Sequence, residues 1–268
     1  MWWRAASTLA ALAMFTAGPA AAGDQPSVAV IGIVMDDLGY SLADGERVIR
    51  LPGAVACAIL PHTPYGERLA RQAYAHHKEV ILHLPMESLN ETSLGPGALD
   101  SRMRALDIFI ALQSGLQAVP HAAGVSNHMG SFLTQQPQAM QWLMAAIASK
   151  GDLFFVDSRT TAQSVAAKLA QEAEIPSLER DIFLDDQRDT DSIRARLDEL
   201  LALARKRGTA VAIAHPYEET LRVLKERLRA LPASGYRLAR LGEILAIRAR
   251  LKVPARRGPG AVGARPGG

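Results

Sequence analysis

The chain has 268 residues, of which 49% are apolar, 21% are charged and one is a cysteine. The apolar fraction is ample for a buried core, which excludes a collagen-like or broadly disordered chain, and the single cysteine excludes a disulfide scaffold. The formal charge of +3 is concentrated near the two ends, and the body between residues 23 and 250 carries −2, which provides no basic footprint for nucleic acid.

Residues 1–22 have the pattern of a secretory signal peptide. Arg4 forms a short basic region, an apolar stretch follows it, and Ala20-x-Ala22 forms a small-residue cleavage site. We expect the mature protein to begin near Gly23 or Asp24 and to act in the periplasm. The alternative is an uncleaved membrane anchor, but the stretch is shorter than the roughly 20 residues that a spanning helix needs. No other stretch is long and uncharged enough, so we expect no membrane span after cleavage.

Short apolar runs alternate with amphipathic stretches along the body, which is typical of an α/β domain with a parallel sheet. The predicted strands are 28–35, 54–60, 79–84, 122–127, 153–157, a run that ends at 180–185, 209–215 and 236–241. The clearest predicted helices are 102–118, 135–150, 160–173, 190–207 and 217–231. We therefore expect a distorted (β/α) barrel with seven or eight strands.

A doubly wound open sheet is the alternative fold. Polar clusters follow almost every apolar run, from Asp36-Asp37 to His215. In a barrel the carboxyl ends of all strands meet at one mouth, so these clusters could share a single site. An open sheet would gather only the clusters beside its switch point. The distribution of the clusters therefore favours the barrel.

Residues 251–268 form a basic tail that is rich in Gly, Pro and Arg. Such a composition cannot bury enough surface to order itself, so we expect this tail to be disordered. The sequence thus predicts three segments, which are a signal peptide (1–22), one barrel domain (23–250) and the tail (251–268).

Three clusters indicate a metal site. Asp36 and Asp37 leave a predicted strand together, so one carboxylate can bind a cation while the other acts as a base, unless both merely cap the following loop. His83 follows an apolar run, where an imidazole is either a metal ligand or a hydrogen-bonded core residue. His128 follows Asn127 between two glycines, where an incidental turn residue is the alternative. Together, Asp37, His83 and His128 offer one carboxylate and two imidazoles, a set suited to Zn²⁺ or a similar divalent ion.

Later clusters supply candidate catalytic residues. His215 ends a late strand, where its imidazole can serve as a general acid. Asp157 and Arg180 are candidates for support of the chemistry. Arg180 could orient Asp36, or it could tune His215 through Asp157 or Asp181.

Other residues have a weaker signal. Asp185 and Asp186 also follow a predicted strand, and we interpret them as caps of the next helix. No G-x-x-x-x-G-K-[ST] or G-x-S-x-G motif occurs, so a phosphate loop and a nucleophile elbow have no support. A serine near a histidine, such as Ser126 or Ser158, is too weak a signal for acyl-enzyme chemistry.

The sequence resembles the divergent polysaccharide deacetylase family, within the NodB-like carbohydrate esterase superfamily, in an ordered series of motifs: MDDLGY, HLPMES, GVSNHMGS, VDSRT, RDIFLDD and AIAHP. This resemblance covers nearly the whole mature body and implies a distorted (β/α) barrel that hydrolyses N-acetyl groups on an amino sugar with the help of a metal. By the same resemblance Asp36 is the base and His215 is the acid. The metal ligands would be Asp37, His83 and His128.

The sequence departs from the larger group in two ways. No H-x-x-x-H segment holds both histidine ligands, so they must come from two strands. The Thr-Phe that usually precedes the DD pair is replaced by Val34-Met35, and Leu38 stands before Gly39. These departures keep open a second hypothesis, in which a non-catalytic envelope protein binds glycan or a cell-wall partner through the same mouth.

The leading hypothesis is a metal-dependent hydrolase that removes N-acetyl groups from peptidoglycan or another amino-sugar polymer, with Zn²⁺ as the first candidate metal. A metal phosphoesterase is a third reading and would need a second metal or a richer carboxylate cluster. We expect a glycan as the main partner, a cell-envelope protein as a further candidate partner, and no nucleic acid.

Overall fold

The structure is a computed structural model that describes residues 28–90 and 93–252. The predicted signal peptide and all but the first two residues of the predicted tail lie outside these ranges. The strands are β1 (Ala29–Leu38), β2 (Ala56–Ile59), β3 (Val80–Met86), β4 (Ala122–Met129), β5 (Phe154–Asp157), β6 (Ser177–Glu179), β7 (Ile182–Phe183), β8 (Thr209–Ala214) and β9 (Tyr236–Leu238). The α-helices are α1 (Leu42–Ile49), α2 (Gly66–Ala75), α3 (Ala105–Ala118), α4 (Pro137–Ala148), α5 (Ala166–Glu172), α6 (Thr190–Arg207), α7 (Glu218–Ala230) and α8 (Leu241–Lys252).

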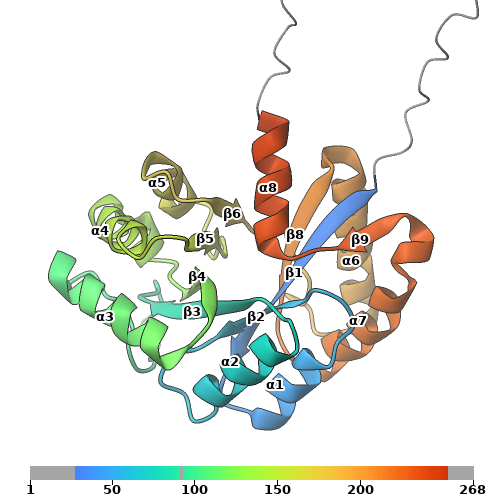
Figure 1. Ribbon diagram of the computed structural model, residues 1–268, viewed down its shortest axis with the longest axis horizontal. Helices are drawn as coiled ribbons and strands as arrows, with labels where there is room; N and C mark the ends of the chain where they lie inside the picture. Colours follow the sequence, from blue (N-terminus) through green and yellow to red (C-terminus); the bar gives the residue numbers. More distant parts are fainter. Residues whose placement is uncertain (1–27, 91–92, 253–268) are drawn as a thin grey trace, which may run out of the picture.

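The sheet is parallel throughout, and most neighbours in the sheet are also neighbours in the sequence. The strand order is β6-β5-β4-β3-β2-β1-β8-β7, with β9 paired to β1. This order has no reversal of the kind that defines a doubly wound sheet. The sheet instead curls into a half-barrel with helices between its strands (Figure 1). The predicted distorted (β/α) barrel is confirmed.

The two edges of the curled sheet are joined by the chain itself. β6 pairs with β5 and β7 pairs with β8, although only Arg180 and Asp181 separate β6 from β7. Asp181 fixes this crossing, because its backbone N–H donates to the Val211 carbonyl over 2.9 Å and its carboxylate accepts from the Val211 N–H over 2.8 Å. Arg180 is therefore held at the seam of the barrel.

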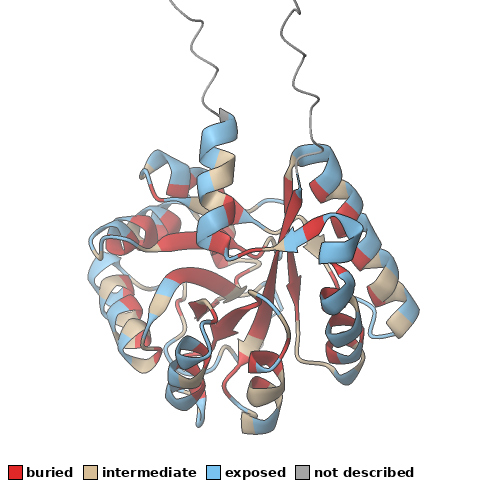
Figure 2. Ribbon diagram, turned by 45° about the vertical axis from the view of Figure 1, so that its right-hand side comes forward, coloured by how far each residue is buried: buried red, intermediate tan, exposed pale blue. Residues whose placement is uncertain are grey.

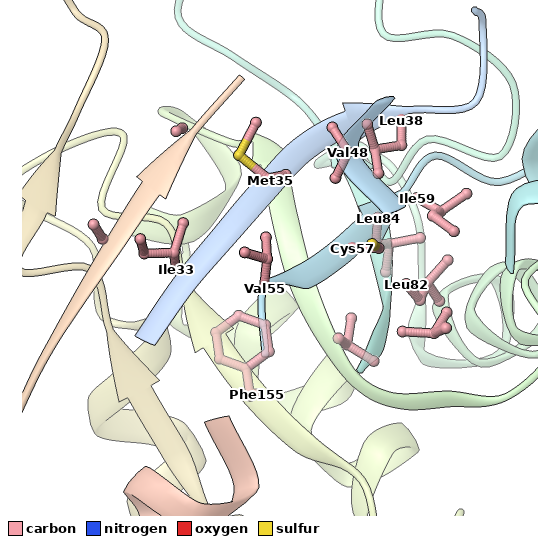
Figure 3. Close-up of a cluster of buried hydrophobic side chains, with 14 of the residues drawn as sticks. Ile33, Met35, Leu38, Val48, Val55, Cys57, Ile59, Leu82, Leu84 and Phe155 are labelled. Atoms are coloured by element: carbon pink, nitrogen blue, oxygen red, sulfur yellow. The ribbon is translucent and has the colours of Figure 1, made fainter. Parts of the chain in front are cut away.

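Strand side chains alternate between an outer and an inner apolar layer. On β1, Ile33 and Met35 belong to the outer layer, which also contains helix residues such as Leu69; Figure 3 labels both among the buried side chains of this layer. Val30 and Val34 belong to the inner layer. Figure 2 shows the result, with buried strands at the centre and helices whose outer faces are exposed. Asp36 lies two residues after Val34 on β1, so its side chain points to the same inner side of the sheet.

Helix α8 covers the inner layer, although it is not among the helices that the sequence predicts most clearly. Its Leu241 and Ile244 pack into this layer beside Gly32 of β1, where a side chain would leave no room for them. Glu79, which precedes β3, accepts hydrogen bonds from the backbone N–H groups of Leu241 (2.6 Å) and Gly242 (3.2 Å). The helix thus begins at the amino ends of the strands, away from the polar clusters at their carboxyl ends.

Two inner glycines give a test of this packing. A Cβ on Gly124 would lie 2.5 Å from the ring of Phe154, whereas a Cβ on Gly32 would meet the methyl ends of Ile244 and Leu241 at 2.7 and 2.8 Å. The rigid ring of Phe154 can move away from a new methyl group less easily than the flexible ends of the Ile244 and Leu241 side chains can. We predict that Gly124→Ala lowers the free energy of unfolding by about 1–3 kcal/mol, and that Gly32→Ala lowers it by less. Urea unfolding measures both, and the reverse order would contradict this account.

Candidate metal centre and active site

The end of β1 carries two consecutive carboxylates into one cleft. Neighbouring side chains of a regular strand point to opposite faces. Here the pairing of β1 with β2 shifts register between Met35 and Leu38, and Asp37 has a φ of 60°. This irregularity turns Asp37 toward the side to which Asp36 already points. Both carboxylates line the cleft, and Asp36 is only 3% exposed.

His83 is an inward residue of β3 and is almost completely buried. Its Nδ1 lies 2.8 Å from the hydroxyl oxygen of Ser126, which is its partner in register on β4. When Nδ1 donates its proton to this hydroxyl, Nε2 presents a lone pair to the cleft. Nε2 lies 3.2 Å from Asp37 Oδ1 and 3.4 Å from Asp36 Oδ2.

His128 reaches the same point from the end of β4. Its Nδ1 lies 2.7 Å from Asp37 Oδ1. The chain turns sharply after it, because Met129 and Gly130 have φ angles of 54° and 88°. The side-chain N–H of Asn127 donates to the Met129 carbonyl over 2.8 Å and braces this turn.

The three predicted ligands form a set that fits a divalent ion. One ligand atom from each of Asp37, His83 and His128 lies within 4.8 Å of the others. Asp37 Oδ1 is close to both imidazoles, and this oxygen is itself buried. Lone pairs that converge in this way suit a cation. Two imidazoles and one carboxylate also leave open positions around Zn²⁺ or a similar ion.

The two carboxylates of β1 differ in their acidity. Burial raises the pKa of Asp36, and the charge of Asp37 adds to this effect against the opposing effect of nearby histidines. Burial acts in the same direction on Asp37, but His128 and His83 outweigh it and hold the pKa of Asp37 below its usual range. Asp37 is thus the carboxylate that stays ionised, as a ligand must, and Asp36 is the one that takes up a proton more readily.

His215 follows β8 and faces the same cleft. Its Nδ1 lies 3.0 Å from Asp185 Oδ1, and its backbone N–H donates to Asp185 Oδ2 over 2.7 Å. Thr220 of α7 also donates to Asp185 Oδ2, over 2.8 Å. Asp185 therefore orients the imidazole, and its interpretation as a helix cap is corrected. The expected partners of His215, Asp157 or Asp181, do not contact it.

Asp157 points away from the cleft, although the sequence suggests it as a catalytic residue. One carboxylate oxygen accepts from the backbone N–H of Arg159 over 2.8 Å, and the other accepts from the Ser164 hydroxyl over 2.7 Å. Asp157 thus folds the loop after β5. Its outward direction follows from alternation, because it continues the series of Phe155, which belongs to the outer layer.

Arg180 lines the cleft but does not bond to the side chains of Asp36 or Asp157. Its Nε donates to the Ser158 carbonyl and one Nη donates to the Arg159 carbonyl, both over 2.7 Å. Burial lowers the pKa of Arg180, while Asp36 and Asp157 act in the opposite direction. Its role in the structure is to hold the loop after β5 against the seam of the barrel.

The cleft has a volume of about 490 Å³ and gathers most of the predicted site residues. Its lining consists of Asp36, Asp37, His83, Asn127, His128, Met129, Ser158, Arg159, Thr160, Arg180, Phe183, Ile213 and His215. A larger groove of about 650 Å³ lies between α5 and α8 and contains none of these residues. Sequence reasoning missed Asp185, the imidazole-orienting Ser126, and the residues 158–160. The alternation of side chains along each strand could have indicated that Ser126 and Ser158 face inward, because Val125 and Phe155 face outward.

A family model for divergent polysaccharide deacetylases matches residues 33–245. The chain belongs to this family. An uncharacterized protein of Haemophilus influenzae is 37% identical over 202 residues, which are 75% of this chain and 72% of that protein. The uncharacterized protein YibQ of Escherichia coli is 35% identical over 202 residues, which are 75% of this chain but only 63% of that protein. Membership supports a hydrolase of carbohydrate metabolism with a glycan substrate, in a family that is generally metal-dependent.

Solved structures share the fold of this deacetylase-family chain. An uncharacterized protein of Agrobacterium tumefaciens has a TM-score of 0.77 at 24% identity, over 81% of this chain and 89% of that one. A CE4 family pseudoenzyme from Bacillus anthracis has a TM-score of 0.50 at 13% identity, over 82% of this chain and 66% of that one. Among the residues that the structure describes, no helix combines the length and the apolar character that crossing a membrane requires.

Metal binding tests the site directly. We predict that the mature protein binds about one Zn²⁺ per chain, and that His83→Ala and His128→Ala each abolish this binding without unfolding the protein. Ser126→Ala, which removes the partner of His83, should weaken the affinity by about 10- to 100-fold. Elemental analysis and titration calorimetry measure these changes. His62→Ala is the matched control, because His62 contacts Ser114 outside the cleft. Unchanged metal content in either ligand variant would contradict the site.

Proposed function

We propose that this protein is a metal-dependent hydrolase that removes N-acetyl groups from an amino-sugar glycan of the cell envelope, such as peptidoglycan. One observation carries the proposal. A cation-binding set, a buried carboxylate and an oriented histidine, drawn from β1, β3, β4 and the end of β8, line a single cleft. Amide hydrolysis needs these three elements, which are an electrophilic centre, a base and an acid.

Asp37, His83 and His128 would hold the ion. When bound, a divalent ion there supplies a Lewis acid that polarises the acetyl carbonyl and makes a nearby water more acidic. Asp36 acts as the base beside this set. Its Oδ1 is buried without a hydrogen-bond partner, so it is free to accept the proton of the attacking water.

His215 acts as the general acid. Its Nδ1 is engaged by Asp185, so its Nε2 faces the cleft, 3.7 Å from Asp37 Oδ2. Nε2 donates a proton to the nitrogen of the departing amino sugar. Burial lowers the pKa of His215, but the hydrogen bond that the imidazole donates to Asp185 and the charges of Asp36 and Asp37 outweigh burial and raise it. A raised pKa favours the protonated imidazole that a general acid requires.

The setting of the reaction is part of the same proposal. The signal-peptide pattern of residues 1–22 supports export to the periplasm, where an amino-sugar polymer of the envelope is accessible. We infer that the protein acts there on its glycan, with a cell-envelope protein as a candidate partner.

A non-catalytic glycan-binding protein is the second candidate. It is favoured by the departure from the H-x-x-x-H pattern, and a pseudoenzyme with a TM-score of 0.50 shows that the fold occurs without activity. Saturable glycan binding without acetate release would support this candidate. A phosphoesterase with two metals has less support, because the described residues contain a single His/Cys/Asp/Glu cluster of metal-binding geometry.

Substitution of the base and the acid tests the proposed chemistry. We predict that Asp36→Asn and His215→Ala each reduce the rate of acetate release from N-acetylated amino-sugar oligomers by about 10²- to 10⁴-fold, while the bound metal remains. Asp186→Asn is the matched control, because Asp186 pairs with Arg196 outside the cleft. Loss of metal in His215→Ala would assign His215 to the ligands instead.

The pairing of Asp185 with His215 predicts a pH effect. Because Asp185 raises the pKa of the acid, Asp185→Asn should lower that pKa. A general acid is active only when protonated, so the alkaline limb of the kcat profile should move to lower pH by about one unit. The profile is measured as acetate release between pH 5 and pH 10. A uniform loss of activity with an unmoved limb would show that Asp185 serves only the fold.

A further inference from the structure

Three consecutive residues after β5, Ser158, Arg159 and Thr160, form one wall of the cleft. Side chains of an extended segment would alternate between two faces. Arg159, however, has a φ of 51°, in the left-handed region that residues other than glycine seldom adopt. All three residues of the 158–160 wall nevertheless line the cleft.

Hydrogen bonds to Asp157, to Arg180 and to β4 hold the 158–160 wall in place. The backbone N–H of Arg159 donates to Asp157 over 2.8 Å, and Arg180 donates to the carbonyls of Ser158 and Arg159 over 2.7 Å. The Thr160 hydroxyl donates to a carbonyl of β4 over 2.9 Å. A strained segment that its surroundings fix so fully is a candidate for a binding role.

Ser158 has a hydroxyl that lacks a partner. The residue is 5% exposed and lines the cleft, and its buried Oγ makes no hydrogen bond. Its backbone N–H, in contrast, donates to the side chain of Asn127 over 2.9 Å. A buried hydroxyl is normally satisfied, so an acceptor on a ligand is the missing partner that the site provides for.

Arg159, the next residue in the chain, adds a positive charge to the 158–160 wall. Its side chain is 35% exposed, and one Nη lies 3.1 Å from Glu179, which is itself 48% exposed. A guanidinium has five N–H donors, so one contact with Glu179 leaves donors for a ligand. The planar fork of these donors matches the two oxygens of a carboxylate better than a single sugar hydroxyl.

We propose that the 158–160 wall is a subsite for a carboxylate carried by the substrate sugar. Ser158 donates to one carboxylate oxygen, and Arg159 contributes the charge and further donors. This inference rests on the proposed function for the position of the acetamido group at the metal centre. It adds that the glycan unit in the cleft is an acidic amino sugar rather than a neutral one.

The experiment compares two ligands that differ only in charge. These are the disaccharide of N-acetylglucosamine and N-acetylmuramic acid, and the methyl ester of its carboxyl group. Titration calorimetry on the Zn²⁺-loaded protein should give about 10- to 100-fold tighter binding of the acid, the range expected for a charge-assisted hydrogen bond. Arg159→Gln should bring the ratio of the two affinities near one. Ser158→Ala should weaken binding of the acid by about 5- to 10-fold.

Controls separate this subsite from other causes. Arg71→Gln removes an arginine that pairs with Glu67 on α2, and it should leave the ratio unchanged. Arg159→Lys keeps the positive charge but lacks the planar set of donors, so it should give an intermediate ratio of the affinities for the acid and the ester. Equal binding of acid and ester by the wild type, or binding of neither, would overturn the inference. A preference that survives in Arg159→Gln would also overturn it, because the carboxylate would then bind elsewhere, for example at the metal.

Acetate release is measured separately on both ligands, so the two proposals can fail independently. A preference for the acid without acetate release would leave the subsite standing and overturn the hydrolase. Acetate release from both ligands without any preference for the acid would support the hydrolase and overturn the subsite.

Discussion

The rest of the site depends on one constraint, which is that two adjacent carboxylates, Asp36 buried and Asp37 partly exposed, lie together at the end of β1. Asp36 and Asp37 repel each other, and neither can be removed from water without compensation. The fold supplies that compensation from three other strands, because His83, His128 and His215 converge on the pair. A barrel is suited to this task, since the carboxyl ends of its strands meet at one mouth. A divalent cation would complete the balance of charge.

Most of this arrangement could be predicted from the sequence, because strand side chains alternate strictly over most of their length. Val34 faces the inner layer, so Asp36 had to face the cleft as well. The same rule applied to β5 gives the correct answer where our sequence analysis did not. Phe155 faces outward, so Asp157 does too, and Ser158 faces the cleft. The error lay in weighing the chemistry of a carboxylate above the geometry of its strand.

The rest could not be predicted, because alternation stops where the strands end. Asp37, Met129 and Arg159 all have positive φ angles there, between 51° and 60°. Each costs free energy that only tertiary contacts can offset, so local propensity argues against all three. The pairing of Asp185 with His215 has a similar origin, because the two residues meet only when the chain crosses the seam from β6 to β7 and runs beside β8. Neither feature leaves a pattern in the sequence.

Because the sequence has no H-x-x-x-H segment, the two histidines of the candidate metal centre are held by the sheet and not by one local segment. His83 lies in register with Ser126 on β4, and His128 lies in register with Pro85 on β3. The separation of the two imidazoles is therefore set by the hydrogen-bond ladder between β3 and β4. Every residue of β3 is buried, as is the centre of β4, and the buried hydroxyl of Ser126 on β4 orients the imidazole of His83. The same strand pairing that packs the core thus sets the positions of the two histidines. A chain that lacks the H-x-x-x-H pattern of the larger group can therefore still hold both imidazoles rigidly.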